Sequence, residues 1–141
     1  MMADTNKTKK KPTVLIVDDD PSICRILEKI LQKEGYNIMI ANSGRQAIKI
    51  VERETVQLVL LDIQMNGMDG MDILQVIKSI SSDTNIIMMT AHPTLETARK
   101  AMEHYAYDYV TKPFDIDFLT KLIKKCLTEN DPSYEEGKQD V

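Results

Sequence analysis

The sequence predicts an α/β fold in which a parallel sheet is doubly wound, with helices on both of its faces. Strand-like and helix-like patterns alternate five times along the 141 residues, and this alternation is typical of parallel sheets joined by right-handed crossovers. Three of the strand patterns are continuous apolar runs, which indicates strands buried on both faces. We expect these three at the centre of the sheet and the two more polar strands at its edges.

Five short segments rich in apolar and β-branched residues are the expected strands. In chain order they are Thr13–Val17, Asn37–Ala41, Gln57–Leu61, Asn85–Met89 and Tyr107–Val110. The second and the fifth are the more polar ones, so they should be the edge strands.

Each expected strand is followed by a segment with helical periodicity and a side chain suited to capping its first turn. The expected N-caps are Asp20 before Pro21, Ser43 with Gln46 as a capping box, Asp69, Thr94 and Asp115. The first helix should end at Gly35 and carry Ile26 on its apolar face. The fourth has only a thin apolar face, formed by Leu95, Ala98, Ala101 and Met102.

Length, charge and hydropathy limit the kinds of protein that this chain can be. We expect one domain over 13–129, between a disordered basic tail over 1–12 and a flexible acidic tail over 130–141. A net charge of −4 argues against direct nucleic-acid binding. No apolar run reaches the roughly 18 residues of a membrane span, so we expect a cytoplasmic protein without membrane contact. Cys24 and Cys126 lie in apolar helical patterns and should be buried thiols.

Aspartates directly follow two of the buried strands. Asp18, Asp19 and Asp20 follow the first strand, and Asp62 follows the third. Because the carboxyl ends of parallel strands lie at one edge of the sheet, these carboxylates should be close together. At about 4 Å and an effective dielectric near 20, each pair of like charges costs roughly 4 kcal/mol. A cation should therefore lie among them.

Two further polar residues are expected at the same edge. Thr90 follows the fourth strand and Lys112 follows the fifth. Carboxylates suit a hard cation that retains water and binds phosphate, which describes Mg²⁺. An aspartate beside such a cation can attack phosphorus to form an acyl phosphate if other groups neutralise the transferring oxygens. Lys112 offers a positive charge for this and Thr90 a hydroxyl donor.

Each of these residues also has a plainer explanation when taken alone. The aspartates could cap helices, Lys112 could be a surface lysine, and Tyr109 could simply pack on an edge strand. Only Asp20 directly precedes a helical pattern, which weakens the capping explanation for the other carboxylates.

Four motifs together resemble those of the receiver domain of response regulators in two-component signalling. They are VLIVDDDP over Val14–Pro21, LDIQMNGMDG over Leu61–Gly70, Thr90–Ala91, and YVTKPF over Tyr109–Phe114. The similarity covers about 13–128, with each motif at a predicted strand end. It implies a flavodoxin-like three-layer (βα)5 sandwich of the chemotaxis-receiver type, with sheet order 2-1-3-4-5.

The resemblance also implies roles for the acidic residues. Asp62 resembles the phosphoacceptor aspartate of the family. Asp18 and Asp19 resemble the acidic pair that holds Mg²⁺ together with Asp62 and the backbone carbonyl of Gln64. Asp19 corresponds to the direct metal ligand, and Asp18 to the one that acts through water.

This chain also has counterparts of the family's residues that contact the phosphoryl group or respond to it. Thr90 and Lys112 resemble the pair that contacts the phosphoryl oxygens, and Tyr109 resembles the aromatic whose rotamer follows the threonine. The peptide bond before Pro113 is expected to be cis. Asn66 stands where the family commonly has proline, so the loop after the phosphoacceptor should be less rigid.

The function implied is a switch and not an enzyme with substrate turnover. A sensor histidine kinase, a phosphotransfer protein or a small acyl phosphate would phosphorylate Asp62, and the surface of the fourth helix, fifth strand and fifth helix would then bind a downstream protein. A phosphorylation-dependent homodimer is compatible with this. Two alternatives stay open: a receiver belonging to a longer transcriptional regulator, and a docking module that ignores phosphorylation.

Two other classes of protein fit the residues less well. An aspartyl phosphatase needs an acid two residues after the nucleophile, where this chain has Gln64. A flavin-binding module would need hydroxyls and glycines in the first loop, where this chain has three aspartates.

Overall fold

The computed structural model describes residues 11–129, in which a five-stranded parallel sheet lies between two layers of helices. The strands are β1 Thr13–Val17, β2 Asn37–Ala41, β3 Leu58–Asp62, β4 Asn85–Thr90 and β5 Asp108–Thr111. The helices are α2 Pro21–Lys33, α3 Gly44–Arg53, α4 Gly70–Ile80, α5 Leu95–Glu103 and α6 Ile116–Glu129. The tail expected over 130–141, and all of the basic tail except Lys11 and Pro12, lie outside the described residues.

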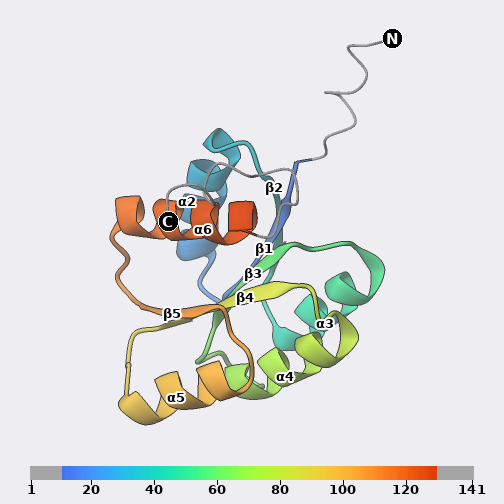
Figure 1. Cartoon of the computed structure of the whole chain (residues 1–141), viewed down its shortest axis with the longest axis vertical. Coiled ribbons are helices and arrows are strands. Elements are labelled where there is room, and N and C mark those ends of the chain that lie inside the picture. Colours follow the sequence, from blue (N-terminus) through green and yellow to red (C-terminus); the bar gives the residue numbers. More distant parts are fainter. Residues whose placement is uncertain (1–10, 130–141) are drawn as a thin grey trace.

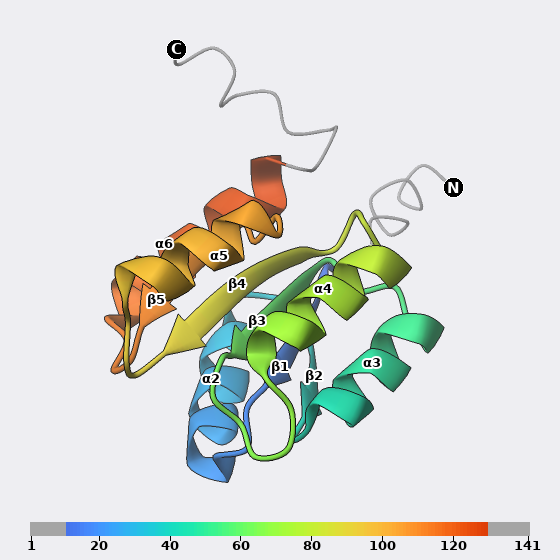
Figure 2. The ribbon, with the colours of Figure 1, turned by 90° about the horizontal axis from the view of Figure 1, so that it is seen from below.

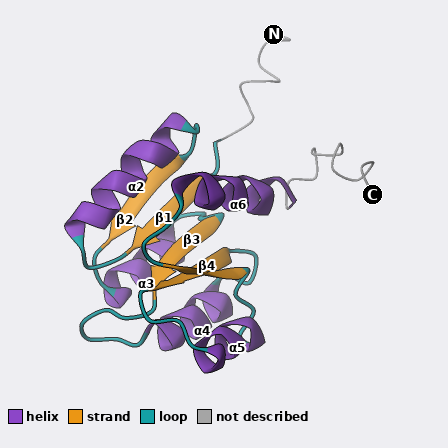
Figure 3. Cartoon of the chain, turned by 90° about the vertical axis from the view of Figure 1, so that its left-hand side faces the viewer, coloured by secondary structure: helices purple, strands orange, loops and turns teal. Residues whose placement is uncertain are grey.

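The strand order is β2-β1-β3-β4-β5, with every neighbouring pair parallel. This confirms the doubly wound, flavodoxin-like α/β architecture and the central positions of β1, β3 and β4. Figure 1 shows α2 and α6 on one face of the sheet and α3, α4 and α5 on the other. The views from below and from the side show the same layers (Figures 2 and 3).

Alternate residues of the central strands supply two separate apolar cores. Ile16, Leu60 and Ile87 pack toward α2 and α6, and all three are fully buried. Leu15 and Val59 belong to the opposite core, beneath α3, α4 and α5. Continuous apolar runs are therefore required in these strands, because neither face of the sheet reaches water.

Three strands, β3, β4 and β5, differ by one residue at one or both ends from those that the sequence predicts. β3 extends to Asp62 and β4 to Thr90, because Asp62 still pairs with Met89, and Thr90 with Thr111. β5 likewise begins and ends one residue later than predicted. The sequence pattern ends at the last apolar side chain, whereas the backbone ladder continues, and so two of the polar residues of interest are held inside the sheet.

The predicted N-caps are formed, with one correction. Asp20 Oδ1 accepts from the Ser22 amide at 2.9 Å and Ser43 Oγ from the Gln46 amide at 3.2 Å. The capping box at Ser43 is incomplete, because Gln46 Oε1 accepts from the Asn42 amide instead of the Ser43 amide. A complete capping box is present at the start of α5.

Helix α2 ends just before Gly35, as the sequence predicts. Gly35 adopts a φ of +96°, and its amide donates to the Gln32 carbonyl at 3.0 Å. The left-handed conformation is open to glycine without steric cost, and it turns the chain from α2 toward β2.

Two predicted apolar faces are wrong in part. Ile26 on α2 is 55% exposed, and Leu95 and Met102 on α5 are 84% and 49% exposed. On α5 only Ala101 is buried. Helical periodicity identifies an apolar stripe but not how far the sheet extends beneath it, and α5 lies over the edge strand β5 (Figure 1). This helix is attached to the core by few side chains.

Within residues 11–129, none of the helices combines the length and the apolarity that a membrane span requires. Cys24 and Cys126 are buried, as the sequence predicts. Burial raises the pKa of the Cys24 thiol to about 11 and that of Cys126 to about 12.

Candidate functional site

Three carboxylates meet at the carboxyl edge of the sheet, as the sequence predicts. Val17 lies opposite Leu61 in the β1–β3 ladder, which places the residues that follow them side by side. One oxygen from each of Asp18, Asp19 and Asp62 lies within 4.8 Å of the others. Asp18 is 1% exposed and Asp62 is 5% exposed, whereas Asp19 faces solvent. Two of the three charges are therefore largely removed from water.

Lys112 supplies one cation to this cluster. Its Nζ lies 2.7 Å from Asp18 Oδ2 and 3.3 Å from Asp62 Oδ2. The Lys112 amide donates to the Thr90 carbonyl at 2.7 Å, which continues the β4–β5 pairing and fixes the start of the side chain. One ammonium group thus joins two carboxylates from different strands, and it offsets part of their mutual repulsion.

The electrostatic balance within the cluster is uneven. Burial raises the pKa of Asp62, the charge of Asp18 raises it further, and Lys112 only partly opposes them. Burial disfavours the charged form of Lys112, but its hydrogen bond to Asp18 and the charges of both aspartates outweigh burial and raise the Lys112 pKa. The fold therefore keeps Lys112 charged and leaves Asp62 with excess negative charge around it.

Backbone amides fix the direction of each carboxylate. The amide of Asp20 donates to Asp18 Oδ1 at 2.9 Å, and that of Gln64 donates to Asp62 Oδ1 at 3.2 Å. The Asn66 amide donates to Asp19 Oδ2 at 3.1 Å. Proline has no amide hydrogen, so the bond to Asp19 depends on having a residue other than proline at 66. The sequence alone does not reveal this contact, which joins two loops 47 residues apart.

Thr90 and Tyr109 have hydrogen-bond partners outside the carboxylate cluster. Thr90 is buried at the end of β4, and its Oγ1 accepts from the His92 amide at 3.0 Å. The Tyr109 hydroxyl lies 2.6 Å from Thr97 Oγ1, at the start of α5. The peptide bond between Lys112 and Pro113 is cis, as the resemblance implies.

Residues 14–124 match the family model described as the response regulator receiver domain. The chain belongs to this family. A curated relative, the transcriptional regulatory protein ZraR of Escherichia coli K12, is 43% identical over 114 residues, which cover 81% of this chain and 26% of ZraR. The chain thus spans about a quarter of the length of that relative.

Two solved structures show the same likeness in three dimensions. The receiver domain protein (CheY-like) of Methanospirillum hungatei JF-1 has a TM-score of 0.78 at 30% identity, covering 83% of this chain and 94% of that one. The beryllofluoride-activated NtrC4 receiver domain dimer has a TM-score of 0.79 at 35% identity, covering 83% and 97%. Both support the receiver-domain fold.

The donor set of this receiver domain fits a hard divalent cation. Asp18, Asp19 and Asp62 offer carboxylate oxygens, which Mg²⁺ prefers and binds together with retained waters. Gln64, whose carbonyl the family resemblance adds to the set, forms a bridge with Asp69 that closes the loop after β3. Asp18, Asp19 and Asp62 would therefore hold Mg²⁺.

Close packing at Gly70 sets the position of Asp62. The Gly70 amide donates to the Ile63 carbonyl at 3.0 Å. A Cβ on Gly70 would lie 2.6 Å from Ile63 Cα and 2.8 Å from the Asp62 carbonyl oxygen. Both contacts are with backbone, which has little freedom to move, so the start of α4 can approach β3 this closely only with glycine.

We expect Gly70→Ala to lower the free energy of unfolding by about 2 kcal/mol, because relieving this overlap must shift either α4 or the end of β3. Urea denaturation measures the loss, and the amide resonances of Asp62 and Ile63 report the shift. Gln75→Ala, on the exposed side of the same helix, is the matched control and should change little. Equal stability of Gly70→Ala and the unaltered protein would contradict the packing argument.

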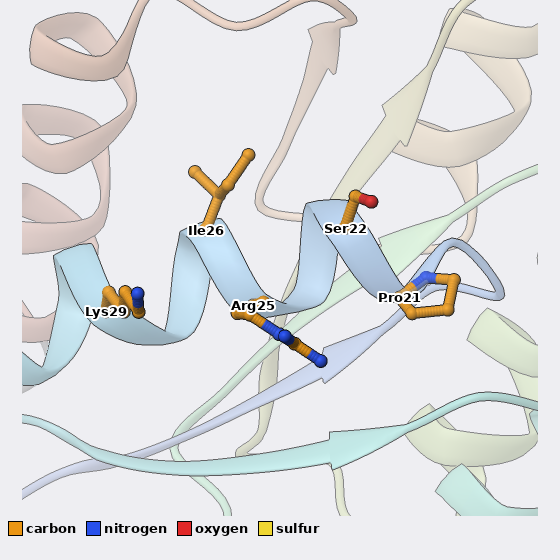
Figure 4. A pocket seen from close by; sticks show the side chains of 5 residues that line it. All are labelled: Pro21, Ser22, Arg25, Ile26 and Lys29. Atoms are coloured by element: carbon orange, nitrogen blue, oxygen red, sulfur yellow. The ribbon is translucent and has the colours of Figure 1, made fainter.

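The helix that follows the acidic loop presents a hollow of about 370 Å³. Figure 4 shows the residues that line it along α2: Pro21, Ser22, Arg25, Ile26 and Lys29. It combines an exposed apolar side chain with two cationic ones, next to Asp18 and Asp19 in the chain.

Proposed function

We propose that this receiver domain accepts a phosphoryl group on Asp62 in a Mg²⁺-dependent reaction and uses it as a switch for protein binding. The observation that carries the proposal is the position of Lys112 Nζ, 2.7 Å from Asp18 and 3.3 Å from Asp62. A structural ion pair needs only one carboxylate. Here one ammonium group contacts two carboxylates of a cluster of three, so negative charge remains uncompensated unless a further cation binds. A transferred phosphoryl group with bound Mg²⁺ suits such a site.

In the proposed reaction, an Asp62 carboxylate oxygen attacks phosphorus of the donor. For a phosphohistidine donor, the P–N bond breaks as the P–O bond forms, and the imidazole leaves with the electron pair. Bound Mg²⁺ supplies positive charge to the carboxylates and to the phosphoryl oxygens. Lys112 would contact one phosphoryl oxygen, and Thr90, at the end of the adjacent strand β4, would donate its hydroxyl to another.

The proposed donor is a sensor histidine kinase or a phosphotransfer protein, in keeping with a cytoplasmic protein. The hollow on α2 supports this, because Ile26 is exposed and lies within two helical turns of the acidic loop. A partner that brings phosphohistidine to Asp62 would cover this face. The proposed chemistry is limited to phosphorylation of the chain itself and its hydrolysis, so the protein is a switch and not an enzyme with turnover.

The proposed output surface is formed by α5, β5 and α6. It carries exposed apolar side chains, namely Leu95, Met102, Tyr105, Ile116 and Phe118. A second copy of the chain is one candidate occupant, because the NtrC4 receiver relative was solved as a dimer in its activated form. Relatives such as ZraR are transcriptional regulators of greater length, so nucleic-acid binding would belong to a further domain.

The test is Mg²⁺-dependent labelling with acetyl phosphate, followed by intact mass. We expect one added phosphoryl group on the unaltered protein and none on Asp62→Asn, because the amide oxygen is a poor nucleophile. Asp83→Asn, at an exposed aspartate before β4, should label normally. Equal labelling of Asp62→Asn would refute the assignment. Normal labelling without any change in partner binding would favour the docking-module alternative.

A further inference from the structure

The hydroxyl of Tyr109 is held by the first turn of α5. Tyr109 Oη lies 2.6 Å from Thr97 Oγ1, and it accepts from the Thr94 amide at 3.3 Å. The ring packs against the core on the α3, α4 and α5 side of the sheet. Tyr109 therefore joins the edge strand β5 to a helix that is otherwise attached to the core by few buried side chains.

Thr97 is the residue that makes this connection. Thr94 Oγ1 accepts from the Thr97 amide at 3.0 Å, and the Thr94 amide donates to Thr97 Oγ1 at 3.2 Å, which forms a complete capping box. Thr97 Oγ1 thus contacts the cap and the Tyr109 hydroxyl at once. Capping alone does not require the tyrosine, because the box is closed between the two threonines.

We propose that Thr97 is a positioning residue that holds the Tyr109 hydroxyl at the start of α5 in the unphosphorylated protein. This inference rests on the proposed function, and it adds the role that the family resemblance implies for Tyr109, whose rotamer would change when Thr90 turns to the phosphoryl group. Such a change would move the Tyr109 hydroxyl away from Thr97 and from the Thr94 amide, so the first turn of α5 would lose its hydrogen bonds to β5. The hydrogen bond between Thr97 and Tyr109 therefore stabilises the unphosphorylated conformation relative to the phosphorylated one.

The direction of the effect follows from linkage. A residue that stabilises only the state in which Tyr109 is bonded to α5 lowers the population of the other state, and removing that residue raises the apparent affinity of any ligand that favours the other state. We expect Thr97→Val to raise that population about fivefold, which corresponds to about 1 kcal/mol, the net contribution of one hydrogen bond.

The experiment uses beryllofluoride with Mg²⁺ as the probe of the phosphorylated state. Thr97→Val should reach half-saturation at about fivefold lower beryllofluoride than the unaltered protein. In NMR spectra without the probe, the Tyr109 ring resonances of Thr97→Val should already lie closer to their saturated positions. Thr97→Ser keeps the hydroxyl and should behave like the unaltered protein.

Two further variants separate positioning from capping. Thr94→Ala removes the cap hydroxyl but leaves the Thr97–Tyr109 contact, so it should speed amide exchange in α5 without changing beryllofluoride affinity. Tyr109→Phe removes the same hydrogen bond from the other side, and combining it with Thr97→Val should add nothing further. Equal shifts in Thr94→Ala and Thr97→Val, or fully additive effects in the double variant, would overturn the inference.

Failure of the inference is distinguishable from failure of the proposed function. If saturating beryllofluoride changes no resonance of the unaltered protein, the proposed switch is overturned, and the inference with it. If resonances change but Thr97→Val binds the probe like the unaltered protein, Thr97 is only part of the cap, and the inference fails while the switch stands.

Discussion

Lys112→Met is expected to lower the free energy of unfolding of the metal-free protein by about 3 kcal/mol at pH 7. Breaking a buried ion pair by removing one partner typically costs 3–5 kcal/mol, because the other charge stays buried without compensation. We take the lower end, because the Lys112 side chain is 14% exposed. Here two carboxylates, Asp18 and Asp62, lose the same partner. Urea denaturation in the presence of a chelator measures the loss.

Three comparisons isolate the charge effect of Lys112→Met. Lys121→Met, on an exposed position of α6, is the matched control and should change stability by less than about 0.5 kcal/mol. The deficit should shrink as the pH is lowered, because the pKa of Asp62 is raised by burial and by the charge of Asp18, and protonation of Asp62 removes the repulsion. Added Mg²⁺ should restore part of the stability by binding only the folded state. A loss below about 1 kcal/mol would mean that Lys112 is not what balances the cluster.

Most of the fold could be predicted because the apolar pattern of each central strand shows that both of its faces are buried. Continuous runs such as Leu58–Leu61 are fully buried in the structure, and only a strand covered on both faces requires such a run. The strand order, in contrast, follows from no local pattern. It came from the family resemblance, and the ladders confirm it.

The acidic cluster was predictable for a topological reason. Parallel strands end at one edge of the sheet, so residues that follow different strands must meet there whatever their separation in sequence. The need for a cation was predictable from electrostatics, and Lys112 meets it in part. Which carboxylates the lysine contacts was not, because that depends on the rotamer of a long side chain from β5.

Two features were beyond sequence reasoning because they depend on the spacing between elements. Leu95 and Met102 are exposed because α5 lies over the edge strand. The helical periodicity of the sequence does not reveal where a helix lies on the sheet. The contact between Tyr109 and Thr97 joins residues 12 apart on different elements. A threonine in the first turn of a helix is explained by capping alone, so nothing in the sequence indicates its second partner.

Asp62→Asn is expected to stabilise the metal-free protein by about 1 kcal/mol at neutral pH, a rough estimate of one partly compensated like-charge pair. The folded-state pKa of Asp62 is raised, so the fold favours the neutral form. Asparagine imitates that form, and Lys112 keeps Asp18 as its closer partner at 2.7 Å. Thermal or urea unfolding in chelator measures the gain, with Asp83→Asn as the unchanged control.

The stability gained by Asp62→Asn should depend on pH, whereas a gain from packing alone would not. A group whose folded pKa lies above its unfolded value adds stability below the unfolded pKa, and this stability is lost as the pH rises through the folded pKa. The advantage of Asp62→Asn should therefore disappear as the pH falls well below the ordinary aspartate pKa of 3.8, and grow toward neutral pH.

Mg²⁺ should reverse the ranking, because only the protein with all three carboxylates gains the full stabilisation from the bound cation. The Asp62 charge would thus destabilise the metal-free protein and stabilise the Mg²⁺-bound protein, which is a functional reason to retain it. An advantage of Asp62→Asn that persisted unchanged well below the ordinary aspartate pKa of 3.8, or that survived saturating Mg²⁺ unchanged, would show instead that Asp62 is an ordinary buried aspartate of the sheet edge.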